Sequence, residues 1–219
     1  MTDAAAAWSG LEPPWRTAFQ LAWESLCAGS VPVGAVVVDS AGSVVASGRS
    51  RAMEPAPVPG QLAHTTVAHA EINALARLPP GPHPDYTVYT TLEPCLMCAG
   101  ALVVSRIGAV HFAGTDPLWA GIARLPELNP FVAARWPKRS GPFSDPFGAL
   151  ATLLPLLFYL ERYPDGGSAA IHRMALPNIR RLGDELVAAG DPRRWRDRTL
   201  AVVLDEIWPR LDRAARSEP

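Results

Sequence analysis

The chain is organised around the stretch Thr91-Leu92-Glu93-Pro94-Cys95-Leu96-Met97-Cys98 (residues 91–98), which follows a shorter one, His69-Ala70-Glu71. Histidine nitrogens and cysteine thiolates are usual zinc ligands, and a catalytic zinc site keeps three protein ligands where a structural site has four. His69, Cys95 and Cys98 would supply those three. Glu71 is then left as a carboxylate near the metal that can take up and return a proton. The two stretches therefore predict a catalytic zinc site, with Glu71 as its acid/base.

Each part of this pattern also has a purely structural interpretation. A Cys-x-x-Cys pair can be a redox pair or half of a closed zinc site. A closed site would need a fourth ligand, for which Cys27, His64 and His111 are the candidates. That arrangement would leave Glu71 without a role, so we favour the catalytic interpretation.

The ligand spacing indicates two helix N-termini that meet at the metal. Cys95 and Cys98 share one face of a helix that Pro94 can begin, because proline is tolerated at the first helical position. The positive end of the helix dipole favours thiolates there. His69 opens a second helix, predicted over residues 69–78, which two prolines end.

The other segments of the N-terminal half alternate between helical and strand patterns. A helix is predicted over 15–28, a proline-rich loop over 51–66, and strands over 33–39, 43–48, 86–90 and 107–112. This order is typical of an α/β protein in which helices cover both faces of a mixed sheet. We therefore expect a three-layer α/β/α sandwich, with the metal ligands where strands end and helices begin.

The composition changes after residue 125, which suggests three segments. Residues 1–125 are expected to form the catalytic core, 126–146 a proline-rich linker or strap, and 147–219 a helical C-terminal extension. Helices are predicted over 149–163 and over 168–189, the latter bent at Pro177. A last helix carries an apolar stripe of Leu200, Val203, Leu204, Ile207, Trp208 and Leu211. Such a stripe must be buried, so the extension packs on the core or forms a subunit interface.

Composition favours a soluble protein of a reducing compartment. The chain has 219 residues, of which 48% are hydrophobic and 19% charged, and a net charge of −1. Cys27 is the only cysteine outside the motif, so no disulfide framework is expected and a cytoplasmic location is favoured. The N-terminus is not typical of a signal peptide, and the apolar stretch 149–160 is too short to span a bilayer.

The charge pattern does not favour a nucleic-acid partner. Proteins that dock on RNA usually present a basic surface. The arginines near residue 195 form a local cluster that two aspartates dilute, which is more typical of a solvated helix face; they are Arg193, Arg194, Arg196 and Arg198. A small-molecule substrate is the partner we expect.

From about Trp15 to Trp119 the chain resembles the cytidine deaminase superfamily, and most closely its branch of tRNA adenosine deaminases and bacterial guanine deaminases. The resemblance lies in residues 31–38 (VPVGAVVV), 69–71 (HAE) and 91–101 (TLEPCLMCAGA), with Arg106-Ile107 and Asp116 beyond them. It implies that His69, Cys95 and Cys98 hold Zn²⁺ and that Glu71 is the general acid/base. Zinc-activated water would attack the carbon that bears an exocyclic amine, and Glu71 would relay protons to the ring nitrogen and the departing ammonia.

The resemblance also implies a set of substrate contacts. The backbone N–H of Ala70 would meet the ring edge, and Val33, Gly34 and Ala35 would line the pocket. Relatives often have asparagine in a Gly-x-Asn pattern after the second strand, where this chain has Gly48-Arg49-Ser50. Ser50 is shorter, and Arg49 or Arg51 either brings a charge or faces solvent. His64 and Trp119 are further candidates, to close over or stack on an aromatic ring.

Three functions remain open on these grounds. The favoured one is a zinc-dependent hydrolase that releases ammonia from a free nucleobase, nucleoside or related amino-heterocycle. The second is conversion of adenosine to inosine in tRNA, against which the absent basic field and Ser50 argue. The third is a noncatalytic binding module, against which Glu71 and the complete ligand set argue. The resemblance further implies a homodimer.

Overall fold

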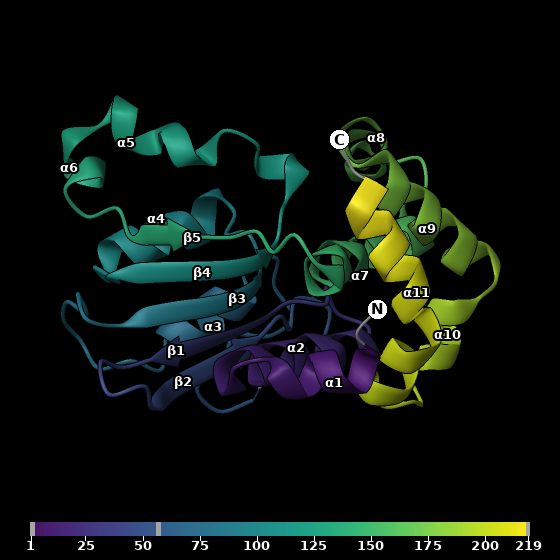
Figure 1. Cartoon of the computed structure of the whole chain (residues 1–219). Helices are drawn as coiled ribbons and strands as arrows, with labels where there is room; N and C mark the ends of the chain where they lie inside the picture. Colours follow the sequence, from purple (N-terminus) through teal and green to yellow (C-terminus); the bar gives the residue numbers. More distant parts are fainter. Residues whose placement is uncertain (1–2, 56–57, 218–219) are drawn as a thin grey trace.

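The computed structural model describes residues 3–55 and 58–217 (Figure 1). Residues 1–2, 56–57 and 218–219, which include part of the predicted proline-rich loop, lie outside the described residues. The strand order in the sheet is β2-β1-β3-β4-β5. β1 is antiparallel to both β2 and β3, whereas β3, β4 and β5 are parallel, so the predicted mixed sheet is confirmed. The strands are β1 (Gly34–Val38), β2 (Val44–Arg49), β3 (Thr87–Leu92), β4 (Ala109–Gly114) and β5 (Lys138–Ser140).

Helices cover both faces of the sheet, because its central strands are apolar on both sides. Every residue of β1 is buried. Two glycines allow helices to approach the strands closely: a Cβ on Gly34 would lie 2.1 Å from the Ala18 carbonyl oxygen, and one on Gly48 would lie 2.5 Å from that of Ala70. One layer therefore contains α2 (Pro13–Cys27), and the opposite layer contains α3 (Ala70–Leu75) and α4 (Leu96–Val104). The three-layer sandwich is as predicted.

Strand β5 lies in segment 126–146, for which the prolines predict a linker or strap. It pairs with β4 in parallel, with Ala109 opposite Lys138, and it forms the edge of the sheet. It has three residues, none fully buried, so it carries no apolar alternation that would indicate a strand. The chain reaches it through the short helices η1 (Pro117–Trp119), η2 (Ile122–Arg124), α5 (Leu125–Leu128) and α6 (Pro130–Ala133).

The C-terminal helices pack on the core beside α2, which is one of the two predicted placements (Figure 1). Phe19 and Trp23 of α2 share one apolar cluster with α7, α9 and α11. The helix predicted over 168–189 is two helices that meet at Leu176, because a residue before proline avoids the helical conformation. The helices are α7 (Pro146–Arg162), α8 (Gly167–Ala175), α9 (Pro177–Ala188), α10 (Asp191–Trp195) and α11 (Leu200–Ser217), and at the other end of the chain α1 (Ala4–Gly10).

The arginine cluster near residue 195 is engaged within the protein. Arg193 and Arg196 pair with Glu161, Arg194 pairs with Asp191, and Arg198 pairs with Glu206. These contacts tie the end of α7 to the α10 region, and they tie the segment after α10 to α11. Among the helices that the structure describes, none is long and apolar enough to cross a membrane.

Candidate metal centre and active site

The three predicted ligands converge at the ends of two elements. His69 immediately precedes α3, and Cys95 immediately precedes α4, with Cys98 in the first turn of that helix. The His69 Nδ1 atom lies 3.6 Å from the Cys95 sulfur and 3.5 Å from the Cys98 sulfur. All three ligand atoms lie within 4.8 Å of one another. The predicted convergence of two helix N-termini is therefore present, although α3 ends at Leu75, earlier than predicted.

This donor set fits a zinc ion. With zinc–sulfur bonds of ~2.3 Å and zinc–nitrogen bonds of ~2.0 Å, tetrahedral geometry separates sulfur from nitrogen by ~3.5 Å. The His69 nitrogen is separated from the two sulfurs by 3.5 and 3.6 Å. Among the described residues, the cluster of potential metal ligands contains these three side chains and no fourth. Three ligands of this chemistry are typical of a catalytic rather than a structural site.

Protons are distributed unequally over the three ligands. The hydrogen bond from Cys98, above all, lowers the pKa of Cys95 to about 4, and the hydrogen bond with His69 acts in the same direction. The same Cys98–Cys95 bond, together with burial, raises the pKa of Cys98. The hydrogen bond to Cys95 raises the pKa of His69. Cys95 is thus a thiolate that faces two proton donors, and both donors would release their protons when a metal binds.

Glu71 lies beside the ligand cluster and is almost completely buried. The Thr90 hydroxyl donates a hydrogen bond to Glu71 Oε1 at 3.1 Å, and the Cys98 thiol lies 3.3 Å from Oε2. Burial, above all, raises the pKa of the Glu71 carboxyl, which the charge of His69 opposes. A carboxyl with a raised pKa can both accept and return a proton near neutral pH. Thr90 was not among the predicted site residues, because a buried threonine on a strand gives no local signal.

A cavity of about 290 Å³ opens onto this cluster. Of the residues predicted to contact a ligand, Val33, Ser50 and Ala70 line it, together with His69, Glu71 and Cys95. Four other predicted residues lie outside its lining: Gly34, Ala35, His64 and Trp119. Gly34 packs against α2 and Ala35 is in the core beneath the sheet. His64 lies on the loop after β2 and Trp119 ends η1, and both side chains are exposed.

Other residues also line the cavity, although they were not predicted to contact a substrate. Asp116 follows β4, and its Oδ1 accepts a hydrogen bond from the Leu118 N–H at 3.0 Å. Burial raises the pKa of Asp116 to about 7. The end of α7 contributes three aromatic residues from the C-terminal extension: Phe158, Tyr159 and Tyr163. Their sequence signal was an apolar helical run, which does not tell which side chains face a cavity.

The two arginines that flank Ser50 do not line the cavity. Arg49 and Arg51 both pair with Glu54, and Arg51 also donates to Gln61 at 2.6 Å. This network folds the loop after β2 so that Ala52 and Met53 face the cavity. The Ser50 hydroxyl is buried and has no hydrogen-bond partner in the protein. The arginines therefore shape the loop, and Ser50 presents the unpaired polar group.

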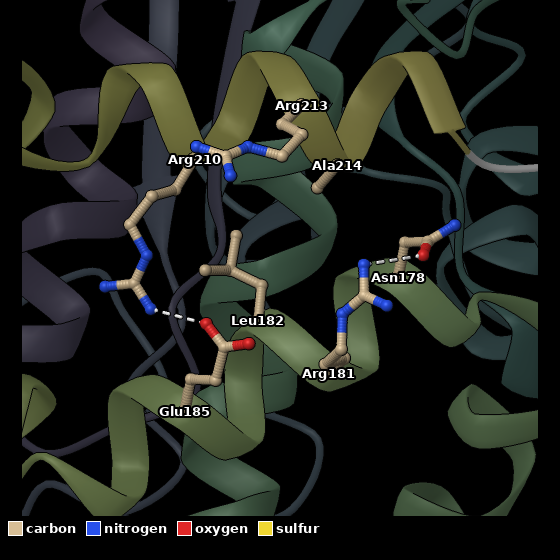
Figure 2. A pocket seen from close by; sticks show the side chains of 7 residues that line it. All are labelled: Asn178, Arg181, Leu182, Glu185, Arg210, Arg213 and Ala214. Atoms are coloured by element: carbon tan, nitrogen blue, oxygen red, sulfur yellow. Dashed lines mark hydrogen bonds and ion pairs between the residues drawn. The ribbon is translucent and has the colours of Figure 1, made fainter.

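A larger hollow of about 530 Å³ lies between α9 and α11 (Figure 2). Its rim carries Arg181, Arg210 and Arg213, of which Arg210 pairs with Glu185 at 2.9 Å and Arg181 donates to Asn178 at 3.0 Å. It contains none of the predicted metal ligands and no acid/base near them. The chemistry is therefore concentrated in the smaller cavity.

Comparison with known proteins agrees with this geometry. Residues 12–114 match the family described as "Cytidine and deoxycytidylate deaminase zinc-binding region". A tRNA-specific adenosine deaminase of Rickettsia bellii is 32% identical over 105 residues, which are 46% of this chain and 68% of the relative. A cytosine deaminase of Candida albicans is 32% identical over 92 residues, 41% of this chain and 56% of the relative.

A solved guanine deaminase structure from Nitrosomonas europaea shares the fold. Its TM-score is 0.50 at 22% identity, over 67% of this chain and 84% of that one. The chain spans 26% to 58% of the length of the first curated relatives it matches. The ligand trio, the neighbouring buried glutamate and these matches agree: the chain belongs to the cytidine and deoxycytidylate deaminase family, whose members are zinc-dependent deaminases.

Proposed function

We propose that the chain is a zinc-dependent aminohydrolase that replaces the exocyclic amine of a free nucleobase, nucleoside or related amino-heterocycle with oxygen and releases ammonia. The observation that carries the proposal is the position of Glu71. It is buried, held by Thr90, and next to three converging metal ligands on the wall of a cavity. A purely structural metal site does not require a buried carboxyl beside its ligands.

Zinc and Glu71 would have different roles in this reaction. Zinc held by His69, Cys95 and Cys98 would supply a Lewis acid that brings the pKa of water toward neutrality. Glu71 takes one proton from that water and delivers it to the ring nitrogen. It then carries the second proton of the water to the amine, which leaves as ammonia. The hydrogen bond from Thr90 fixes Glu71 Oε1, so the carboxyl keeps one orientation through both transfers.

The charge of the cavity supports a small neutral substrate over tRNA. Its described lining includes the carboxyls of Glu71, Glu93 and Asp116 but no lysine or arginine. A phosphate backbone would therefore find no lysine or arginine among these described lining residues to bind it. The volume of about 290 Å³ is at the lower end of the range for small-molecule pockets. Adenosine in tRNA is the second candidate, because a relative acts as a tRNA-specific adenosine deaminase.

The proposal is tested by ammonia release from a panel of amino-purines, amino-pyrimidines, their nucleosides and amino-triazines, with zinc-replete protein. Release that disappears in Glu71→Ala supports it. Silence across the panel, with one zinc bound per chain, contradicts it. Inosine formation in a tRNA anticodon stem-loop would establish the second candidate. A specific protein partner whose binding is indifferent to Glu71→Gln would instead favour the noncatalytic module.

We expect Ser50→Ala to stabilise the free protein slightly and to weaken substrate binding. The Ser50 hydroxyl is buried without a partner, and removing such a group relieves a desolvation cost of about 1 kcal/mol. If the hydroxyl pairs with substrate, the same change raises KM. Thermal unfolding and steady-state kinetics measure the two effects. A lower melting temperature with an unchanged KM would show that Ser50 only supports the loop.

We also propose a homodimer, with the outer face of α4 as its contact. This helix contains no charged residue, and its outer side chains Leu96 and Val104 are 51% and 79% exposed. A Cβ on Gly100, between them on the same face, would meet no neighbouring atom. Exposed apolar surface of this kind is typical of an interaction site.

Val104→Arg is therefore expected to shift the protein from dimer to monomer, because a charge would be buried in the contact. Light scattering after size-exclusion chromatography measures the molar mass. Val202→Arg is the matched control, since Val202 is 49% exposed on α11, away from this face. An unchanged mass for Val104→Arg, or an equal change for Val202→Arg, would contradict the α4 contact.

The three cysteines are free, and two of them are the predicted metal ligands. Thiolates that must remain reduced to hold zinc suit a reducing compartment. We therefore propose a cytoplasmic location, which cell fractionation tests.

A further inference from the structure

The end of α7 is built into the cavity wall, although it lies beyond residues 12–114 of the family match. Phe158 and Tyr159 lie in the last two turns of α7, and Tyr163 directly follows the helix. Phe158 is buried, Tyr159 is half-buried, and Tyr163 is exposed at the mouth. The helix thus presents an aromatic surface that runs from the interior of the cavity to solvent.

This helix end is held from two sides. Arg162 donates to the Gly29 carbonyl oxygen at 2.9 Å, and its guanidinium lies 4.0 Å above the Phe158 ring. Glu161 is paired with Arg193 at 3.4 Å and with Arg196 at 3.2 Å, and both arginines belong to the α10 region. One anchor joins α7 to the loop before β1, and the other joins it to the rest of the extension. The aromatic surface is therefore placed by packing and does not depend on a bound ligand.

The cavity lining combines residues from two parts of the chain. The α/β core contributes Val31, Val33 and Leu92, which are apolar, and the polar Asp116 lies just beyond the matched residues 12–114. Tyr159 comes from the extension, and burial followed by the charge of Asp116 raises the pKa of its hydroxyl. The hydroxyl is therefore protonated near neutral pH, so it can donate a hydrogen bond. A flat ring in this cavity would have aromatic and apolar neighbours and polar groups with which to pair.

We propose that the C-terminal extension forms the specificity wall of the active site, with Tyr159 as a specificity-determining residue that contacts the heterocycle through its ring and its hydroxyl. This inference rests on the proposed function and names its substrate class: a flat, uncharged amino-heteroaromatic ring with a hydrogen-bonding group at the edge away from the amine. Aromatic contact favours a planar ring. A buried hydrogen-bonding group discriminates strongly, because a substrate without the partner leaves it unpaired.

The test compares Tyr159→Phe, which removes the hydroxyl, with Tyr159→Leu, which also removes the ring. Tyr86→Phe is the matched control, because Tyr86 stacks on His83 and is not part of the cavity lining. Binding of the ring compounds is measured in a Glu71→Gln background, where turnover does not interfere, and kcat/KM is measured in the parent background. Zinc content and melting temperature are measured for each variant to confirm that the fold is retained.

We expect Tyr159→Phe to reduce the preference for the best compound over an analogue that lacks its edge group by about tenfold. Tyr159→Leu should weaken binding of all planar compounds by a further factor of about ten. Tyr86→Phe should change neither. Selective binding that is unaltered in both Tyr159 variants overturns this inference alone. Binding without turnover overturns the proposed function alone, and absence of binding for every compound overturns both.

Discussion

Glu71→Gln is expected to lower kcat by about 10²- to 10⁴-fold, the usual contribution of a general acid/base. The amide has nearly the same shape as the carboxyl and can still accept the hydrogen bond from Thr90, so the fold should persist. It cannot take a proton from water, however, and both proton transfers are lost. KM should change much less than kcat, because Glu71 acts on the reacting atoms in the transition state.

The control for this prediction is Glu127→Gln, the same chemical change at an exposed position on α5, where the side chain pairs with Arg124. That variant should keep full activity. Bound zinc should be equal in Glu71→Gln and the parent protein, as measured by elemental analysis. If Glu71→Gln keeps more than about a tenth of the parent kcat, the acid/base role is wrong.

Cys98→Ser is expected to remove zinc and activity together. Cys98 is buried at the centre of the cluster, 3.5 Å from His69 Nδ1, and serine offers zinc a much poorer ligand. Loss of a hydrogen-bonding partner behind a ligand already costs 10- to 100-fold in metal affinity, so loss of the ligand itself should cost more than about 100-fold. Competition with a chromophoric chelator measures the affinity.

Cys27→Ser is the matched control, because Cys27 is the one cysteine outside the cluster and is only half-buried. It should retain one zinc per chain and unchanged kinetics. The zinc-depleted parent protein should also melt at a lower temperature than the loaded protein, since binding to the folded state stabilises it. If Cys98→Ser retains stoichiometric zinc, the assignment of the three ligands is wrong.

Local patterns predicted the metal ligands and Glu71, and the structure brings these side chains together. The spacing of Cys95 and Cys98, and of His69 and Glu71, is set within one or two turns of helix, so sequence distance converts directly into geometry. The alternation of strand and helix patterns likewise predicted the mixed sheet and four of its strands, because β1 is apolar and β3 is rich in residues that favour strands. Edge strand β5 was missed because a short, half-exposed strand has no such pattern.

The substrate cavity was predicted less well, for a physical reason. Of the predicted contact residues, only Val33, Ser50 and Ala70 line it. Val33 precedes β1, Ser50 follows β2, and Ala70 begins α3. Asp116, Phe158, Tyr159 and Tyr163 reach the cavity from segments far along the chain. Whether a residue on α7 faces the core or the cavity depends on the rotation of that helix, which packing against α2, α9 and α11 sets.

Short sequence motifs thus indicated the family and predicted the metal ligands and the acid/base, since His69 and Glu71, and likewise Cys95 and Cys98, lie within a few residues of each other. The position of the extension, in contrast, depends on tertiary packing. Its position results from contacts such as the hydrogen bond from the Trp23 indole to the Arg198 carbonyl, between residues 175 positions apart, and from the ion pairs of Glu161. Such contacts have no local signature, because they depend on the packing of whole helices. The aromatic side chains that α7 adds to the cavity lining are placed by the same packing.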